Sequence, residues 1–420
     1  MSLPRYPEYK DSGVEWLGEV PGHWGIRKIR WLCQIKKRIS GELGHDVLSI
    51  TQQGIKIKDI ESNDGQISMD YSKYQFVEIG DFAMNHMDLL TGYVDISDVF
   101  GVTSPDYRVF SIRNKEDSYD RYVLYLFQIG YKNKIFYAFG QGSSQFGRWR
   151  LPTEQFNDFF FPLPPIEEQQ AIAAFLDRET EKIDALIAEQ QRLVELLAEK
   201  RQAVISYAVT RGLNPNVPMK DSGIEWLDEV PKHWEIKRLK FLCDVQTGDK
   251  DTINAIDNGE YPFFVRSQTV EKINSFTFDC EAVLTAGDGA GVGKIFHYVN
   301  DKFDFHQRVY MMNNFRFVTG SFFFRYLAAT FHKVALNGGA KSTVDSLRMP
   351  LFMNFEVTVP PITEQSEIID FLDDEIIKFD ALTTEANRAI ALFQERRSAL
   401  ISAAVTGKID VRKVSLAEAV

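Results

Sequence analysis

The chain has 420 residues, too many for one ordinary domain, and this length predicts two or three units, each with its own core. Hydrophobic residues make up 44% and charged residues 25%, the balance of a globular protein rather than a disordered one. The charged start argues against a signal peptide, and no run reaches the roughly 20 apolar residues that cross a bilayer. Three cysteines cannot form a disulfide framework, and no Cys-x-x-Cys pair is present to bind zinc. We therefore expect a cytoplasmic protein without membrane contact.

The formal net charge of −11 is concentrated in two stretches. Residues 164–210 hold 5 basic against 9 acidic side chains, and residues 361–406 hold 4 against 9, which leaves the rest of the chain nearly neutral. Within that rest, one run without an acid contains Arg27, Lys28, Arg30, Lys36, Lys37 and Arg38, and a weaker repeat contains Lys237, Arg238 and Lys240. Such a run is typical of a solvated face, but phosphate binding stays open because the acidic residues lie elsewhere.

An internal repeat organises the chain. Residues 10–33 read KDSGVEWLGEVPGHWGIRKIRWLC and residues 220–243 read KDSGIEWLDEVPKHWEIKRLKFLC, with 15 of 24 positions identical. A second repeated segment starts with PPIEEQ at 164 and PPITEQ at 360 and continues for 47 residues, of which 25 are identical. The chain is therefore a tandem duplication of an opening segment, a variable domain and a long helix.

The variable domains, 46–155 and 245–350, differ in sequence but keep one order of features. Short β-type runs dominate both domains. An Arg-Val-aromatic triplet, an aromatic-rich helical stretch, a polar Gly-rich loop and a short strand ending in proline then follow in each. We expect two α+β domains with one fold and two different surfaces.

Helical periodicity follows the proline pair of each half and continues for about 45 residues. Apolar residues recur in heptad-like steps from Ile172 to Tyr207 and from Ile368 to Ala403, and such a seam requires a partner helix. Each long helix is the natural partner of the other. We expect two long antiparallel coiled-coil-like helices that give the molecule pseudo-twofold symmetry; two ordinary bundle helices in one core are the alternative.

Charged residues interrupt both seams at equivalent positions, and the contacts that they would make depend on the direction in which the helices pair. Glu179 is equivalent to Glu375, and Lys200 to Arg396. With a midpoint near Glu189, antiparallel helices would bring Glu179 to Arg396 and Lys200 to Glu375, whereas parallel helices would bring like charges together. The alternative is that all four side chains point to solvent.

These features resemble the specificity subunit of type I restriction–modification enzymes. The resemblance rests on the paired PPIxEQ–FLD–KxDAL–AVT helices, the paired SGxEWLxEVPxHW segments and the two unlike domains between them, and it covers essentially the whole chain. It implies two target recognition domains, each reading one half of a bipartite target in double-stranded DNA, and helices that set the spacer and dock two methyltransferase subunits. Nuclease–translocase subunits would join outside. The resemblance implies no catalysis and no cofactor in this chain, since S-adenosylmethionine, ATP and magnesium would belong to the partner subunits.

The same resemblance divides the chain along its length. We expect target recognition domain 1 at 1–163, a central spacer helix at 164–210, a linker at 211–219, target recognition domain 2 at 220–359, a C-terminal spacer helix at 360–406 and a tail at 407–420. The residues after the second helix echo those after the first, which predicts that the repeat closes on itself like a ring.

Base readout requires Arg, Lys, Asn, Gln and Ser side chains that reach base edges. The candidates in the first domain are Lys36, Lys37, Arg38, Gln52, Gln53, Lys56, Gln141, Ser143, Ser144, Gln145, Arg148 and Arg150. The candidates in the second domain are Arg266, Gln268, Asn337, Lys341, Ser342, Thr343 and Arg348. Each of them is also compatible with a solvated loop position. The two Gly-rich loops are stronger candidates as groups, because their place in the repeat is equivalent while their residues differ.

The sequence AGDGAGVGK at 286–294 is the strongest catalytic candidate, and it fails the P-loop pattern. A P-loop needs glycine where this chain has Asp288, and a hydroxyl residue where it has Ile295. We expect a tight hairpin between strands at this place. No Asn/Asp-Pro-Pro-aromatic methyltransferase motif and no complete nuclease motif occurs, and His23 and His233 occupy equivalent repeat positions, which indicates a scaffold role.

The sequence is compatible with three functions to different degrees. The first is a DNA-binding specificity subunit; the second is a coiled-coil adaptor that binds only proteins; the third is a stand-alone nuclease or methyltransferase. The absent motifs argue against the third, and the divergence of two domains on a common frame argues against the second.

Overall fold

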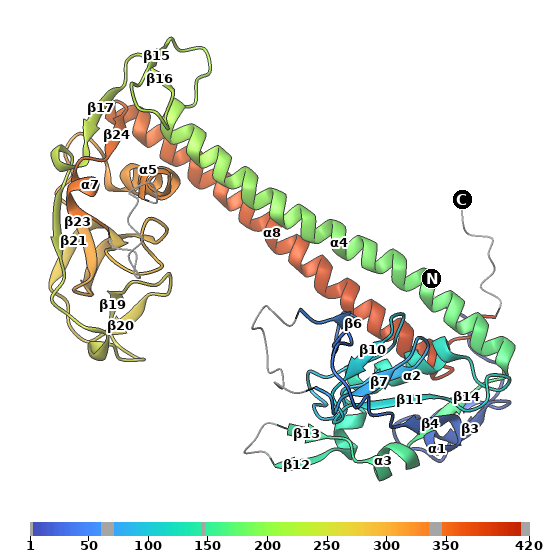
Figure 1. Cartoon of the computed structure of the whole chain (residues 1–420). Helices are drawn as coiled ribbons and strands as arrows, with labels where there is room; N and C mark the ends of the chain where they lie inside the picture. Colours follow the sequence, from blue (N-terminus) through green and yellow to red (C-terminus); the bar gives the residue numbers. More distant parts are fainter. Residues whose placement is uncertain (1–2, 60–70, 144–147, 336–346, 413–420) are drawn as a thin grey trace. The chain divides into compact units, whose positions relative to one another are not determined.

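The computed structural model describes residues 3–59, 71–143, 148–335 and 347–412 (Figure 1). The chain divides into two compact units, residues 1–189 with 389–420 and residues 190–388. Each unit combines one variable domain with part of each long helix, α4 (Ile166–Arg211) and α8 (Ile362–Val405). Among the helices of the described ranges, none has the length and apolarity needed to cross a membrane.

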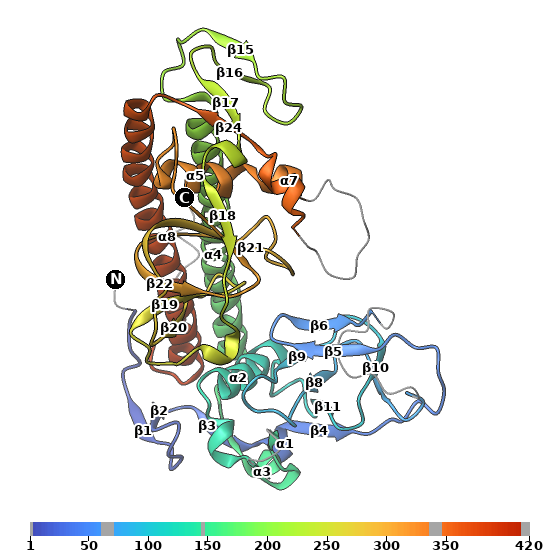
Figure 2. The same cartoon turned by 90° about the vertical axis from the view of Figure 1, so that its left-hand side faces the viewer.

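The first unit is built on a four-stranded antiparallel sheet with strand order β4-β11-β8-β9. Phe127 of α2 packs its ring against Phe82 of β8 and Phe110 of β11, which explains why the predicted helix is rich in aromatic residues. Figure 2 shows the hairpin β5–β6 at one edge of this domain. The elements are β1 (Tyr9–Asp11), β2 (Glu19–Pro21), β3 (Gly25–Lys28), α1 (Ile29–Leu32), β4 (Cys33–Lys36), β5 (Leu48–Thr51), β6 (Gly54–Ile57), β7 (Gln75–Val77), β8 (Phe82–Met84), β9 (Val94–Ile96), β10 (Gly101–Thr103), β11 (Arg108–Ile112), α2 (Asp120–Lys132), η1 (Phe136–Phe139), β12 (Gln141–Ser143), β13 (Arg148–Arg150), α3 (Thr153–Asp158) and β14 (Phe160–Leu163).

The second unit carries a six-stranded sheet with strand order β18-β23-β21-β22-β19-β20, in which only β19 and β22 run parallel. Its helix α5 occupies the place of α2 and buries Phe322, Phe323 and Tyr326 completely. The elements are β15 (Met219–Asp221), β16 (Glu229–Pro231), β17 (Glu235–Arg238), η3 (Leu239–Phe241), β18 (Asp244–Thr247), η4 (Thr252–Asn254), β19 (Tyr261–Phe264), β20 (Glu271–Ile273), β21 (Phe278–Ala286), β22 (Phe296–Phe305), β23 (Val309–Asn313), α5 (Gly320–Thr330), α6 (His332–Ala335), α7 (Met349–Met353) and β24 (Glu356–Val359). The α+β class predicted from the sequence is confirmed.

The repeated PPIxEQ motif fastens the opening segment of each unit to the start of its long helix. In the first unit, the Glu168 carboxylate lies 2.7 Å from His23 Nε2, accepts a hydrogen bond from Trp24 Nε1 at 3.0 Å and accepts another from the Tyr6 hydroxyl. In the second unit, Glu364 makes the equivalent contacts with His233 and Trp234, at 2.8 and 3.0 Å. The scaffold role predicted for the two histidines is therefore confirmed by geometry.

The glutamine of the same motif holds the segment that leads into α2 in the first unit and into α5 in the second. Gln169 Oε1 accepts from the Tyr119 backbone N–H, and its amide donates to the Asp117 and Pro164 carbonyls. Gln365 repeats this pattern with Thr319, Phe317 and Pro360. Both glutamines are completely buried, so each amide exchanges water for three backbone partners.

The long helices are antiparallel, and each unit contains one ion pair between them. Arg397 donates to both oxygens of Asp184, at 2.8 and 3.1 Å, in the first unit. Arg201 donates to Asp380 at 2.7 Å in the second. The two pairs occupy equivalent repeat positions, as antiparallel copies of one helix require.

The predicted pairs of Glu179 with Arg396 and of Lys200 with Glu375 do not form within the described part of the chain. Glu179 instead contacts Arg178 and Lys182, and Glu375 contacts Lys378, all on their own helix. The observed ion pairs place the midpoint near the bond between residues 192 and 193 rather than near 189. The predicted partner of each residue was therefore wrong by about six residues, which is nearly two helical turns.

The predicted seam is also only partly buried. Ile183 and Leu197 are buried, but Leu186 and its repeat equivalent Leu382 are 40% and 54% exposed. A strict heptad drifts around a straight helix of 3.6 residues per turn. In the first unit, the outer turns of both helices pack into the core of the domain, where Leu176 and Ile401 belong to one cluster.

The ring-like closure of the repeat is confirmed inside the first unit. The Tyr9 hydroxyl donates to the Gly407 carbonyl at 3.0 Å, and the Asp410 N–H donates to the Pro4 carbonyl at 2.8 Å. Gly407, after α8, and Gly212, after α4, both have φ of +76°, and each lies within 3.2 Å of the buried tryptophan of its own unit when a Cβ is placed on it. Both positions therefore require glycine.

Candidate nucleic-acid interface

The basic run of the first unit splits into residues with and without a structural partner. Lys36 Nζ lies 2.8 Å from Asp81 Oδ1, and the Arg38 guanidinium pairs with the other oxygen of Asp81 and with Glu78 at 2.6 Å. Asp81 is 2% exposed, so its charge needs these cations close by. Lys37 points away from Asp81 and is exposed, as alternation along an extended strand requires. Of the three predicted contacts, Lys37 alone is free of an ion pair within the described residues.

The hairpin β5–β6 presents three of the predicted residues to solvent. Gln52 and Gln53 form its turn, and Gly54 follows them with φ of +99°. Lys56 Nζ donates to Gln53 Oε1 at 2.6 Å, and Gln52 Nε2 donates to the Thr91 carbonyl at 3.4 Å. Gln52, Gln53 and Lys56 are all exposed, so their remaining donors and acceptors face water.

The hairpin β12–β13 carries the first Gly-rich loop. Gln141 pairs with Arg150 and Ser143 with Arg148 in its backbone register, and Gln141 and Arg150 are exposed. Trp149 donates from Nε1 to the Tyr137 carbonyl at 2.8 Å and covers Gly140, where a Cβ would lie 2.1 Å from the indole nitrogen. The predicted residues Ser144 and Gln145 lie outside the described residues.

A buried arginine supports the base of this hairpin, and it was not among the site residues predicted from the sequence. Arg108 is 4% exposed, donates to the Leu151 carbonyl and to Thr153 Oγ1 at 3.2 Å, and stacks 4.3 Å above the Phe156 ring. Burial lowers the pKa of Arg108 to about 10. Burial, followed by the charges of Arg108 and Arg150, lowers the pKa of the neighbouring His86 to about 3. The Arg-Val-aromatic triplet was the signal available in the sequence.

Two candidate residues of the second unit, Arg266 and Gln268, lie near the loop between β21 and β22. Asp288 accepts from Arg266 at 2.6 Å and from Arg308 at 3.1 Å, and Gln268 is exposed beside them. A shallow hollow of about 530 Å³ is lined by Arg266, Gln268 and Asp288, together with Ser267 and Gly289. The glycine-rich segment thus connects antiparallel strands as expected, but through nine residues rather than a tight turn. Arg266 and Gln268 were predicted from the sequence as DNA-binding candidates, whereas Asp288 and Arg308 were not.

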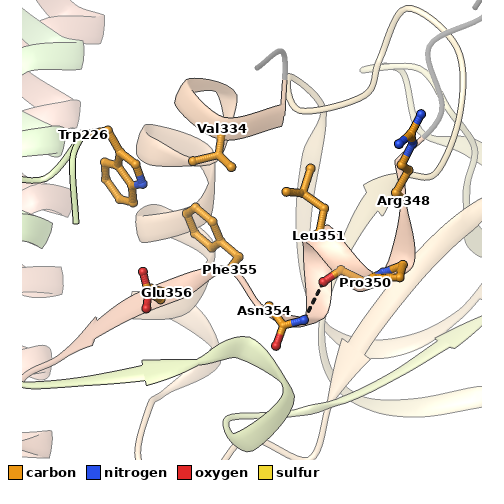
Figure 3. A pocket seen from close by; sticks show the side chains of 8 residues that line it. All are labelled: Trp226, Val334, Arg348, Pro350, Leu351, Asn354, Phe355 and Glu356. Carbon is orange, nitrogen blue, oxygen red and sulfur yellow. Dashed lines mark hydrogen bonds between the residues drawn. The ribbon is translucent and has the colours of Figure 1, made fainter. Parts of the chain in front are cut away.

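The second Gly-rich loop ends at Arg348, directly before α7. Arg348 is exposed and lies at the side of a hollow of about 550 Å³, across from Trp226 (Figure 3). The predicted residues Asn337, Lys341, Ser342 and Thr343 lie outside the described residues. Arg348 and Arg150 occupy the same place in the two units, since each precedes the short helix that leads to the last strand of its domain.

Polar and cationic side chains therefore meet at exposed loops of both units, with different residues in each. Across the described ranges, no group of three or more His, Cys, Asp or Glu residues is arranged to hold a metal ion. The loops offer hydrogen-bond donors and acceptors of the kinds that contact bases and phosphates.

Known proteins give the same picture of the chain. Residues 23–196 and 231–391 each match the family described as the type I restriction modification DNA specificity domain. The chain is 28% identical over 181 residues to the EcoDI specificity subunit, a type I restriction enzyme subunit of Escherichia coli. That match covers 43% of this chain and 40% of the subunit, so it spans less than half of the relative's length.

Two solved structures share the fold. A chain from a structure on complex assembly and conformational transition of the type I R-M system aligns with a TM-score of 0.69 at 16% identity, over 92% of this chain and 98% of that one. The HsdS subunit from Thermoanaerobacter tengcongensis aligns with a TM-score of 0.50 at 14% identity, over 92% and 98%. At identities this low, the alignments show a shared fold and nothing about function. The family match, however, covers well over half of the residues and recurs once in each half of the duplication, and the chain therefore belongs to the family of type I restriction–modification DNA specificity domains.

Proposed function

We propose that this chain is the sequence-reading subunit of a type I restriction–modification complex, and that each unit reads one half of a bipartite target in double-stranded DNA. The observation that carries the proposal is the contrast between frame and loops. Glu168 and Glu364 each contact a His-Trp pair in the same way, while the loops at Gln141 and Arg150 and at Arg266 and Gln268 differ. One frame with two different polar surfaces suits two different half-sites.

We infer further that the long helices set the number of unread base pairs and dock two methyltransferase subunits. Two pairs of equivalent leucines support two equivalent docking surfaces. Leu186 and Leu392 are 40% and 55% exposed in the first unit, and Leu382 and Leu196 are 54% and 44% exposed in the second. Exposed leucines at duplicated positions would leave apolar surface in water unless a partner covers them.

The chemistry then belongs to other subunits. In this proposal, S-adenosylmethionine binds to the methyltransferase subunits, ATP and magnesium act with the nuclease–translocase subunits, and this chain supplies no catalytic group. A protein that selects sites on chromosomal DNA would work in the cytoplasm.

The test is a map of methylated adenine in the host genome, with the wild-type chain, without it, and with one variant in each unit. We expect two half-sites separated by an unread gap. Arg150→Gln should relax the sequence of one half-site, and Gln268→Ala should relax the other. A contiguous palindrome, or loss of both halves with either variant, would overturn the proposal. Absence of DNA binding in a gel shift with the methyltransferase subunits present would favour the protein-only adaptor.

A further inference from the structure

An exposed aromatic side chain occurs at the same repeat position in both units. Trp31, at the end of α1, is 70% exposed, and Phe241, at the end of η3, is 57% exposed. The first and last residues of α1, Ile29 and Leu32, are buried, so the backbone turn is well packed while its largest ring faces water. An exposed ring that recurs at the same repeat position in both units is more informative than an apolar side chain scattered singly on a surface.

Three cations precede each ring within four residues of the sequence. We call Arg27, Lys28, Arg30 and Trp31 the Trp31 patch, and Lys237, Arg238, Lys240 and Phe241 the Phe241 patch. Three cations in each patch occupy equivalent positions, although the chain as a whole carries a net charge of −11.

Some of these cations have protein partners and others do not. Lys28 and Arg30 both pair with Asp158, and Lys240 Nζ donates to Asn354 Oδ1 at 3.0 Å. Arg27 and Arg238 are exposed and have no ion pair or side-chain hydrogen bond within the described part of the chain. Each patch therefore holds one arginine whose five donors face water.

The patches lie close to the loops that we propose as readers. In the first unit, α1 lies beside α3 in both views (Figures 1 and 2), with Asp158 at the end of α3 that faces the patch. Arg150 precedes the other end of α3. Six residues of helix span about 9 Å, which corresponds to two or three base-pair steps of 3.4 Å. In the second unit, Asn354 and Arg348 flank α7 in the same way.

We propose that the Trp31 and Phe241 patches bind the sugar–phosphate backbone of duplex DNA directly outside the bases that each unit reads. The inference rests on the proposed function. Chemistry that is shared by two domains with different targets cannot carry sequence information, and backbone contacts carry none. The guanidinium of Arg27 or Arg238 suits phosphate oxygens, and the flat ring of the same patch suits the apolar face of deoxyribose.

The two patches should not contribute equally. The Trp31 patch has one neighbouring carboxylate, Asp158, whereas Lys237 pairs with Glu235 and Glu356 lines the hollow beside Phe241. The Phe241 patch therefore presents less net positive charge to phosphates, and we expect the Trp31 patch to dominate the salt dependence.

The experiment measures binding of the full chain to two labelled duplexes of equal length, one carrying the mapped target and one a random sequence, over a series of salt concentrations. Arg27→Gln should weaken binding to both duplexes by the same factor and reduce the slope of log affinity against log salt by about 1. Trp31→Ala should also weaken both equally. Lys10→Gln, which removes an exposed cation elsewhere in the same unit, is the matched control and should change neither value. Unchanged melting temperatures would show that the variants fold.

Three results would overturn the inference while leaving the proposed function intact. Unchanged affinity and slope in Arg27→Gln and Trp31→Ala would remove the backbone contact. Loss on the target duplex alone would make the patch a base reader. If both variants instead lose co-purification with the methyltransferase subunit and keep DNA binding, the patch is a protein interface and the inference fails. A wild-type chain that binds neither duplex, alone or with that subunit, would remove the proposed function itself.

Discussion

At the scale of single residues, the two units differ in how deeply they bury the glutamate of the PPIxEQ motif, which we call the anchor. Glu168 is 5% exposed and satisfies three donors, whereas the side chain of Glu364 is 24% exposed and satisfies two. The difference follows from Tyr6, which has no counterpart in the second unit.

We predict that Glu168→Gln destabilises the protein more than Glu364→Gln. An amide has one acceptor oxygen in place of two and turns its NH2 group toward donors, which leaves buried partners unsatisfied at a cost of about 1–3 kcal/mol. Calorimetric unfolding of the full chain measures the loss, with the exposed neighbour Glu167→Gln as a control that should have no effect. Equal losses in the two anchor variants would contradict the role of burial.

A buried histidine gives the first unit a dependence on acid. Burial and then the charges of Arg108 and Arg150 lower the pKa of His86 from 6.5 to about 3. Below pH 6.5 the unfolded chain binds a proton at this residue and the folded chain does not, so stability is lost as the pH falls. The loss is at most about 1.4 kcal/mol per pH unit.

We therefore predict that His86→Asn flattens the pH dependence of the unfolding temperature between pH 6.5 and about pH 5, above the range where most carboxylates titrate. The wild-type chain should lose unfolding temperature over this range, and the variant should lose less. Parallel curves would mean that His86 is protonated in the folded protein.

At the scale of elements, the ion pairs between the long helices report the register. The Asp184–Arg397 pair has two hydrogen bonds, and its arginine side chain is 22% exposed. The Arg201–Asp380 pair has one hydrogen bond, and its arginine side chain is 39% exposed. Solvent screens the second pair more than the first.

We predict a coupling of about 0.2–1 kcal/mol in a double-mutant cycle of Asp184→Asn and Arg397→Gln, and a smaller coupling for Arg201→Gln and Asp380→Asn. The cycle of Glu179→Gln and Arg396→Gln is the control and should give none, because Glu179 has partners on its own helix. A larger coupling in the control cycle would restore the register expected from the sequence.

At the scale of the whole molecule, we propose that the paired helices act as a ruler for the unread gap. Seven residues inserted between Arg192 and Leu193, and seven between Arg388 and Ala389, would lengthen both helices near the midpoint of their pairing. Seven residues are close to two turns and about 10 Å, which corresponds to about three base pairs.

We predict that this double insertion lengthens the gap of the methylated target by about three base pairs and leaves both half-sites unchanged. Either insertion alone should abolish methylation, because one helix would then be out of register with the other. The methylated-adenine map reads both outcomes. An unchanged gap in the double insertion would remove the ruler.

Much of the architecture follows from the sequence, because the duplication aligns every feature twice. The offset between PPIEEQ and PPITEQ placed both long helices, and the repeated His-Trp dipeptides marked residues that turned out to hold the motif's glutamates. Repeated aromatic residues in the stretches that became α2 and α5 predicted the helices that cover each sheet. These features are local or are stated twice, so they need no knowledge of distant contacts.

The tertiary structure alone decided the axial register and the charge partners. A heptad pattern tells which face of a helix is apolar, but it is almost unchanged when one helix slides by a turn, so the anchors at the helix ends fix the register. The run containing Lys36 and Arg38 gave no sign of Asp81, which is more than 40 residues away in the chain and forms an ion pair with each of them. Asp288 likewise joins Arg266 and Arg308 from three separate segments. Such pairings depend on which loops the folded chain brings together, and local composition carries no record of that.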